Sequence, residues 1–272
     1  MEDLSRPKHK PEVLPIVRVV DETPKIKTFY VRSPRVASES EPGQFVMLWV
    51  VGEDEIPIAV SEVRNEDIVG LTVEKVGDAT SELHSLGVGD LIGIRGPYGR
   101  GFGLLGEKFL MIGGGCGMGP LFYAIQRAFD MKKDIEVLIS AKTDSDLLFR
   151  SRVKDMDVDL MVSTEDGSAG IEGVTTDVLE NSSLSWDYDS CLICGPERMM
   201  KLSAEFVRER GVPVQVSLNR YMKCGIGICG QCTIDPSGDR VCEEGPVFNY
   251  EDIRDSEFGE YRRGPSGKRK KL

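Results

Sequence analysis

Apolar residues follow two different rhythms along the chain. Before residue 100, β-branched and aromatic residues gather in short runs separated by turn residues such as Pro42 and Gly43. These runs are residues 16–20, 27–31, 45–50, 71–76 and 91–94. Short strands at near-regular spacing are typical of a small closed barrel. The pattern therefore predicts a β-barrel domain over residues 10–100.

Beyond residue 100 the pattern alternates between short apolar strands and amphipathic helices. The predicted strands are residues 109–112, 135–139, 160–162 and 191–193. One helix has Leu121, Phe122, Ile125 and Phe129 on one face, and another runs from Met199 to Arg210. Such alternation predicts a mostly parallel sheet covered by helices on both faces. We place this α/β domain at residues 101–220.

Length and charge restrict the classes of partner. The chain has 272 residues, enough for two ordinary domains and a small third module, and a formal net charge of −11. An acidic chain is not expected to bind nucleic acid. No apolar stretch reaches the roughly 18 to 20 residues that cross a bilayer, and residues 1–8 lack the apolar core of a secretory signal. We expect no membrane partner and a cytoplasmic location.

The last segment, residues 251–272, carries a basic patch in this acidic chain. Arg262 and Arg263 precede a Gly-Pro-Ser-Gly turn, and residues 268–271 are all basic. Short terminal charge runs are usually solvated. We therefore expect a poorly ordered charged tail.

Four cysteines carry the most specific chemical signal. Cys224, Cys229, Cys232 and Cys242 follow the spacing C-x4-C-x2-C-x9-C, the plant-type ligand pattern of a [2Fe–2S] cluster. Intervening glycines allow a tight loop whose backbone N–H groups face the sulfurs. Structural zinc is the competing interpretation, although zinc sites usually show paired C-x2-C knuckles. We predict a metal-binding module over residues 221–250.

A glycine run, residues 113–120, follows a predicted strand and precedes a helix. Gly115 and Gly117 would let the backbone approach a pyrophosphate at the helix N-terminus, with Pro120 in the place of a third glycine. A strand–helix turn without a ligand is the alternative. Cys194 ends another strand and could lie beside a nicotinamide, because strand carboxyl ends face the ligand crevice. It could equally be a small buried residue.

Together these segments resemble the electron transfer subunits of NAD-linked dihydroorotate dehydrogenase, a branch of the ferredoxin reductase-like flavoproteins. The resemblance covers roughly residues 12–250 and rests on residues 42–49, 93–99, 165–168, 194–200, 217–227 and 242–248. It implies an FAD-binding barrel, a parallel-sheet NAD-binding domain and a small C-terminal [2Fe–2S] module. It also implies a separate FMN-containing catalytic subunit that oxidises dihydroorotate in pyrimidine synthesis, in a heterotetramer with two copies of each.

The resemblance also implies where FAD binds. The residues concerned lie in three segments: Pro57, Ile58, Ala59, Thr72, Val73, Glu74, Ala79 and Thr80. The family commonly has Arg-Pro-x-Ser at the first segment, with arginine toward the pyrophosphate and serine toward the flavin. Here residues 56–59 read Ile-Pro-Ile-Ala and lack both groups. No side chain is expected to act as acid or base, because the cofactors carry the chemistry.

Other functions stay open at this point. The same three cofactor modules would suit the flavin subunit of a sulfide dehydrogenase, a hydrogenase or a ferredoxin:NAD(P) oxidoreductase. A non-enzymatic, zinc-stabilised adaptor that has lost FAD is a candidate from another class. NAD and NADP are not distinguished, because Lys142, Asp144 and Asp146 near the second α/β strand give mixed signals.

Overall fold

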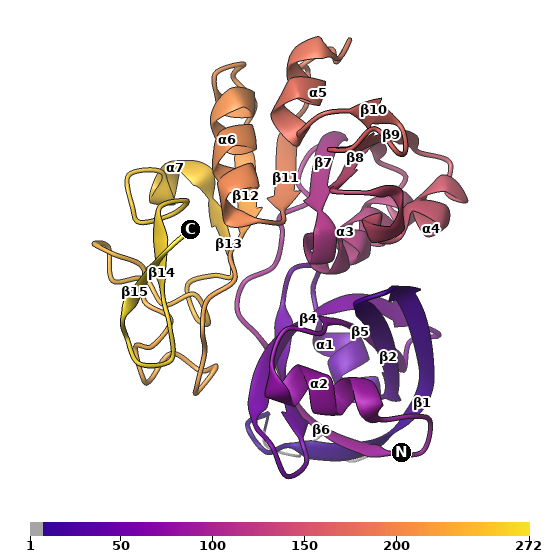
Figure 1. The fold of residues 1–272 in the computed structure, drawn as a ribbon, viewed down its shortest axis with the longest axis vertical. Helices are drawn as coiled ribbons and strands as arrows, with labels where there is room; N and C mark the ends of the chain where they lie inside the picture. Colours follow the sequence, from indigo (N-terminus) through magenta and orange to yellow (C-terminus); the bar gives the residue numbers. More distant parts are fainter. Residues whose placement is uncertain (1–7) are drawn as a thin grey trace.

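The computed structural model describes residues 8–272, so the expectation about a secretory signal falls largely outside it. A closed antiparallel barrel lies beside a seven-stranded sheet (Figure 1). The barrel strands are β1 (Glu12–Thr23), β2 (Ile26–Arg32), β3 (Phe45–Val50), β4 (Glu55–Arg64), β5 (Ile68–Glu74) and β6 (Leu91–Tyr98), in the order β1-β2-β5-β4-β3-β6. The predicted ferredoxin reductase-like barrel is confirmed.

The barrel differs from the prediction at one strand and two helices. Strand β4 was not predicted, because Pro57 interrupts the pattern and proline is uncommon inside strands. The helices α1 (Pro34–Glu39) and α2 (Asp78–Ser85) also escaped the pattern analysis. The barrel interior is filled by fully buried aliphatic side chains: Val31, Val46, Leu48, Val60, Leu71 and Ile92.

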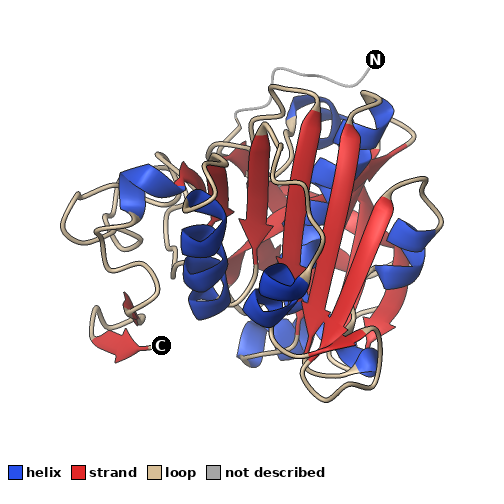
Figure 2. Cartoon of the chain, turned by 90° about the horizontal axis from the view of Figure 1, so that it is seen from above, coloured by secondary structure: helices blue, strands red, loops and turns tan. Residues whose placement is uncertain are grey.

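The second domain is a sheet with helices on both faces (Figure 2). Its strands are β7 (Lys108–Gly114), β8 (Asp134–Ala141), β9 (Asp159–Thr164), β10 (Ile171–Glu172), β11 (Ser190–Cys194), β12 (Val214–Ser217) and β13 (Val247–Asn249), in the order β10-β9-β8-β7-β11-β12-β13. The helices are α3 (Met118–Asp130), α4 (Arg150–Lys154), α5 (Thr175–Asn181) and α6 (Glu197–Arg208). The strand pairs are parallel except β12 with β13.

Burial along β7 explains the two layers. Phe109 and Met111 pack into the core formed with α3, whereas Leu110 and Ile112 pack into the core formed with α5 and α6. A strand that is buried on both faces reads as a continuous apolar run, as predicted here. One detail differs, because Phe129 on the predicted apolar face of α3 is 40% exposed.

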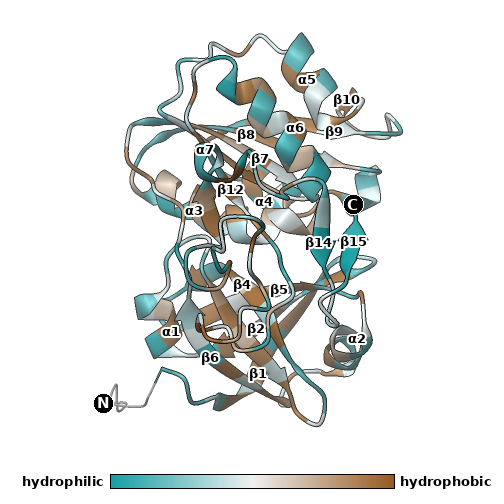
Figure 3. Ribbon diagram, turned by 90° about the vertical axis from the view of Figure 1, so that its left-hand side faces the viewer, coloured by the Kyte–Doolittle hydropathy of each residue, from teal (hydrophilic) through white to brown (hydrophobic). Residues whose placement is uncertain are grey.

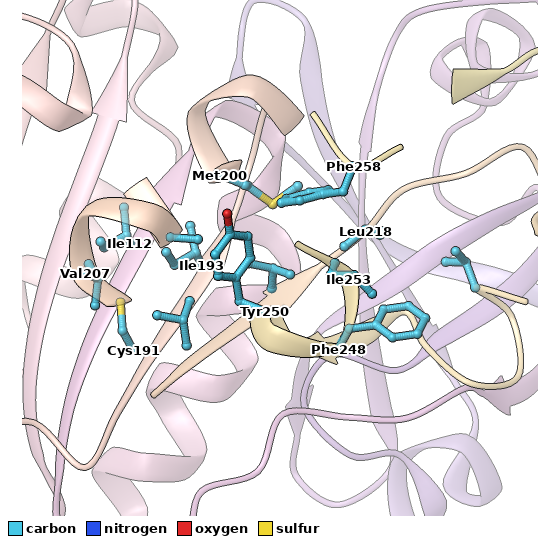
Figure 4. Packing of buried hydrophobic residues seen from close by; sticks show 14 of the residues in the cluster. Ile112, Cys191, Ile193, Met200, Val207, Leu218, Phe248, Tyr250, Ile253 and Phe258 are labelled. Atoms are coloured by element: carbon cyan, nitrogen blue, oxygen red, sulfur yellow. The ribbon is translucent and has the colours of Figure 1, made fainter. Parts of the chain in front are cut away.

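The C-terminal segment is not a poorly ordered tail. It forms α7 (Tyr250–Ile253) and a hairpin of β14 (Tyr261–Arg263) with β15 (Arg269–Lys271). Ile253 and Phe258 are buried in the cluster that holds Met200 of α6 (Figure 4). The prediction was wrong because isolated apolar anchors among charged residues produce no periodic signal. No helix within residues 8–272 is long and apolar enough to cross a membrane.

Candidate functional site

The four predicted cluster cysteines lie in and beside one glycine-rich loop. Gly225, Gly227 and Gly230 have φ angles of +69°, +73° and +68°. Residues with a Cβ rarely adopt these left-handed φ angles, so glycine is required at these turns. The exposed Cys229 faces solvent, and Cys232 and Cys242 are 2% exposed.

Backbone N–H groups converge on the sulfurs of this loop. The donors and acceptors are Gly227 N to Cys242 Sγ at 3.2 Å, Ile228 N and Cys229 N to Cys224 Sγ at 3.4 Å each, and Cys242 N to Cys232 Sγ at 3.4 Å. Such donors favour thiolate over thiol, which is the form that binds metal. The residues present therefore fit a cluster ligated by cysteine.

The four thiols lie close enough to interact. A hydrogen bond with Cys242 lowers the pKa of the Cys232 thiol to about 7, and the same bond raises the pKa of Cys242. Cys224 interacts with the side chains of Cys229 and Cys242. Four neighbouring cysteines at the plant-type spacing fit a [2Fe–2S] cluster.

The cysteine loop rests on the barrel. A Cβ at Gly225 would lie 2.8 Å from Cγ of Met47, so only glycine allows this close approach. Met47 is fully buried on β3, and its register partner on β4 is Pro57. The candidate cluster loop therefore packs against the strand next to the first predicted FAD segment.

A buried arginine ties the loop to the rest of the chain. Arg220 donates to both carboxylate oxygens of Glu197, at 2.6 and 2.8 Å, and to Glu257 at 3.1 Å. The three side chains are at most 7% exposed. This ion-pair group joins the start of α6, the segment before Cys224 and the C-terminal segment. Sequence analysis missed it, because the partners are far apart along the chain.

The glycine run occupies the turn between β7 and α3, as predicted. Gly115 has a φ of +51° and faces open space, so its backbone is accessible to a ligand. Gly117 is different, because a Cβ there would lie 2.5 Å from the carbonyl of Cys194. Gly117 therefore allows the glycine run and the loop after β11 to touch. Pro120 is half-buried in the first turn of α3.

Two cysteines and the end of β5 lie close together at this turn. Cys194 ends β11 opposite Gly113. Cys116, which sequence analysis did not single out, lies in the turn that contacts β5 near Glu74. Burial raises the pKa of both the Cys116 and Cys194 thiols to about 12, so both stay protonated at neutral pH. The barrel residue Glu74 and the glycine run are thus neighbours, so cofactors bound at these two predicted sites would lie close to each other.

The two threonines predicted at the FAD site use their hydroxyl groups within the protein. Thr72 Oγ1 lies 2.9 Å from Thr28 Oγ1 and donates to Ser61 Oγ at 2.8 Å. Thr80 Oγ1 accepts from the backbone N–H groups of Val76 and Gly77, both at 2.9 Å. These threonines shape the barrel wall and the start of α2. Their side chains are not available as additional ligand donors.

The remaining predicted FAD residues offer backbone and apolar surface. Pro57, Ile58 and Ala59 are half-buried on β4, Val73 is buried on β5, and Ala79 is half-buried in the first turn of α2. Two arginines of the barrel already have carboxylate partners. Arg95 on β6 donates from Nε and Nη2 to Glu55 at 2.8 and 2.7 Å, and Arg64 at the end of β4 forms an ion pair with Glu62.

A cavity of about 1010 Å³ lies elsewhere on the domain boundary. It is lined by α1, the β4–β5 turn, α3 and α4, and includes Arg64, Arg127 and Arg152. None of the predicted cofactor residues lines it. Arg152 in its wall forms ion pairs with Glu22 and Glu62 of the barrel, so this cavity borders an electrostatic contact between the domains.

Family models match two parts of the chain. Residues 219–254 match the iron-sulfur cluster binding domain of dihydroorotate dehydrogenase B, and residues 111–205 match the oxidoreductase NAD-binding domain. The first match contains the four cysteines of the loop. The second contains the glycine run and Cys194.

Whole-chain relatives agree with these matches. The chain is 45% identical to the probable electron transfer subunit of dihydroorotate dehydrogenase B (NAD(+)) of Methanothermobacter thermautotrophicus, covering 95% of this chain and 97% of the relative. It is 40% identical to the subunit of the same name in Methanocaldococcus jannaschii, covering 96% and 98%.

Solved structures extend the comparison. One from a study of the NADH-dependent reduced ferredoxin-NADP oxidoreductase is 32% identical, with a TM-score of 0.81 over 89% of this chain and 90% of that one. A ferredoxin NADP+ reductase from Neisseria gonorrhoeae with bound FAD and NADP is 20% identical, with a TM-score of 0.64 over 74% and 92%. The second likeness shows the shared fold.

Proposed function

Because the chain belongs to the family of dihydroorotate dehydrogenase B electron transfer subunits, we propose that it carries electrons from an FMN-containing catalytic subunit to NAD+. The single observation that supports this most directly is the placement of the cysteine loop. It packs on β3 beside the predicted FAD segment and leaves Cys229 exposed. Electrons could then enter at the surface and leave through the barrel.

The division of labour between protein and cofactors follows from the site. When bound, the cluster exchanges single electrons, NAD+ accepts a hydride, and FAD converts between the two modes. Cys224, Cys229, Cys232 and Cys242 would hold the cluster, and the N–H donors of residues 227–229 would stabilise charge on its sulfur ligands. The chain itself supplies position and electrostatics.

The nucleotide sites are assigned to the two sides of the domain boundary. Gly115, with its open left-handed backbone, would approach the NAD pyrophosphate, and Gly117 would hold the adjoining loop that carries Cys194. FAD would lie on residues 57–59 and 72–74, with Ala79 and Thr80 at the start of α2. Its contacts there would be mostly backbone and apolar ones.

The partner would contact the exposed side of the cysteine loop. Ile228 is 78% exposed beside Cys229, whereas Ile226 packs partly into the core of the module. Ile228 is therefore the better candidate for an apolar contact with the catalytic subunit. We propose a heterotetramer with two copies of each subunit, and a cytoplasmic location consistent with seven free cysteines. We propose domain limits of residues 10–100 for the barrel, 101–220 for the α/β domain and 221–250 for the cluster module, with residues 251–272 joined to that module.

Anaerobic purification of the native complex tests this function. We expect a complex with an FMN-containing, dihydroorotate-oxidising subunit, and a chain that contains iron, acid-labile sulfide and FAD. Ile228→Glu should keep both cofactors and NADH–dye activity but uncouple dihydroorotate oxidation from NAD+ reduction. Zinc in place of iron, or a chain that binds no such subunit, would contradict the assignment.

A second function is favoured by one observation. The likeness at 32% identity and TM-score 0.81 comes from a study of an NADH-dependent reduced ferredoxin-NADP oxidoreductase. If the purified complex reduces NAD+ with reduced ferredoxin and not with dihydroorotate, this function replaces the first. The greater identity to the electron transfer subunits, 45%, favours dihydroorotate.

A further inference from the structure

The C-terminal hairpin of β14 and β15 is a basic surface on an acidic chain. It is hydrophilic throughout (Figure 3) and lies beyond residue 254, where the iron-sulfur family match ends. Gln231, which lies between Cys229 and Cys232, donates from Nε2 to the carbonyl of Gly264 at 3.2 Å. The turn of the hairpin is therefore fastened directly to the cysteine loop.

One face of the hairpin has an acidic partner within the protein. Tyr261 donates to Asp235 at 2.8 Å, Arg263 forms an ion pair with the same carboxylate, and Arg269 lies 3.5 Å from it. Arg269 also stacks on the Tyr261 ring, with 4.7 Å to its centroid. Arg263 and Arg269 are opposite each other in the ladder, and the Asp235 carboxylate contacts both, so one of their two positive charges is compensated.

The other face has no such neutralisation. Arg262 and Lys270 are directly opposite each other, and paired residues of an antiparallel ladder share one face. Both are exposed, and within residues 8–272 neither forms an ion pair. Like charges in directly opposed positions destabilise a ladder. Arg262 and Lys270 therefore present two uncompensated positive charges to solvent, where an acidic group of another molecule could pair with them.

We propose that Arg262 and Lys270 dock an acidic surface patch on the protein that donates electrons to the cluster, which rests on the proposed function. The rest of this acidic chain repels an acidic partner at long range, with a net charge of −11. Because the basic hairpin is attached to the cysteine loop, an acidic partner is attracted electrostatically to the part of the surface next to the cluster. Its effect is on orientation and association rate.

The test measures association of the holo chain with the FMN-containing catalytic subunit by stopped flow. Arg262→Glu reverses one charge and creates a favourable Glu–Lys cross-strand pair, so the hairpin is strengthened rather than unfolded. We expect the association rate constant at low salt to fall about tenfold, and its salt dependence to flatten. The double variant Arg262→Glu/Lys270→Glu should fall further. Lys25→Glu, an exposed reversal in the β1–β2 turn, should match the wild type.

The possible outcomes distinguish the docking role of the hairpin from the proposed electron-transfer function. Wild-type association rates in both hairpin variants would overturn the docking role and leave the function intact. A wild-type chain that does not bind the catalytic subunit would overturn the function and the inference together. If the variants lose binding to duplex DNA or phosphatidylserine vesicles while associating normally with the subunit, the hairpin serves a polyanion and the inference is wrong.

Discussion

The cysteine loop and the flavin side of the barrel solve the same problem in different ways. The loop gathers its ligands within a short stretch of chain, residues 224–242, and aims backbone N–H groups at three of the four sulfurs. The proposed flavin side is assembled from β4, β5 and α2. Its two threonine hydroxyls are occupied within the protein, and Ile56 and Ala59 stand where the family resemblance implies a charge and a hydroxyl.

This difference indicates that a metal cluster needs specific side chains more than a bound dinucleotide does. A metal cluster requires thiolate ligands at fixed positions, so the identity and spacing of the ligand cysteines are constrained in the sequence. A large dinucleotide can be held by shape, apolar surface and backbone groups, so individual side chains can change while the fold is kept. We therefore expect the cluster site to be sensitive to single substitutions and the flavin site to tolerate or even gain from them.

The largest effect should come from the cluster ligands. Cys232→Ser should remove nearly all [2Fe–2S] absorbance and dihydroorotate-dependent NAD+ reduction, because one of the four thiolate ligands is lost. NADH oxidation by a two-electron dye should survive, since that route needs FAD alone. Cys191→Ala, in the buried β11 strand, is the control and should keep both activities. A Cys232→Ser protein with a full cluster would refute the ligand assignment.

The next effect concerns the scaffold beneath the loop. Arg220→Met leaves Glu197 and Glu257 buried without their cation and should reduce the free energy of unfolding by about 3–5 kcal/mol. Arg32→Gln breaks an exposed pair with Asp67 and should cost at most about 1 kcal/mol. Denaturant titrations of the two variants would measure the difference. Equal, small losses would show that the buried ion pairs do not stabilise the module.

That variant should also acquire a characteristic pH dependence. Burial raises the pKa of Glu257 above its ordinary value, even beside Arg220. A carboxyl whose folded-state pKa is raised stabilises the fold below that pKa and loses this contribution as pH rises. Without Arg220 the effect grows, so the melting temperature of Arg220→Met should recover toward wild type as pH falls from about 7 to about 5. A widening gap on acidification would contradict this.

A smaller effect is expected at the nucleotide turn. Gly117→Ala should raise the KM for NADH about tenfold, a difference of about 1.4 kcal/mol, because the new Cβ displaces the loop of Cys194. Gly115→Ala meets no protein atom but puts a Cβ into the space proposed for the pyrophosphate, so it should also raise the KM for NADH, and its left-handed backbone should cost about 1–2 kcal/mol of stability. FAD and iron contents should stay normal in both. An unchanged KM in Gly117→Ala would leave the run as a structural turn.

The smallest effect is expected for FAD binding at the proposed flavin side. Ala59→Ser introduces the hydroxyl that the family resemblance implies here and should tighten FAD binding by about 1 kcal/mol, the net value of one hydrogen bond. The dissociation constant from fluorescence titration of the apoprotein measures this. Ala169→Ser, in the other domain, should not change it. Weaker FAD binding in Ala59→Ser would mean that this position does not face the flavin.

Sequence reasoning reached the parts of the molecule whose signal is local. Each of four features has a pattern within a short stretch of sequence: the barrel strands, the parallel strands, the glycine turn and the cysteine spacing. Strand β4 was missed because Pro57 interrupts its pattern. The fold of residues 251–272 was missed because Ile253 and Phe258 are isolated apolar residues among polar ones. The Arg220 group joins Glu197 and Glu257 from distant segments, so only the folded chain brings it together.

Dihydroorotate-dependent NADH formation tests the central claim most directly. It would be measured anaerobically at 340 nm with the purified complex of this chain and its FMN-containing subunit. The account predicts NADH formation that needs both subunits and is lost with Cys232→Ser, while NADH–dye activity persists. NADH formation that continues at the wild-type rate in the cluster-free variant, or that reduced ferredoxin supports and dihydroorotate does not, would contradict it.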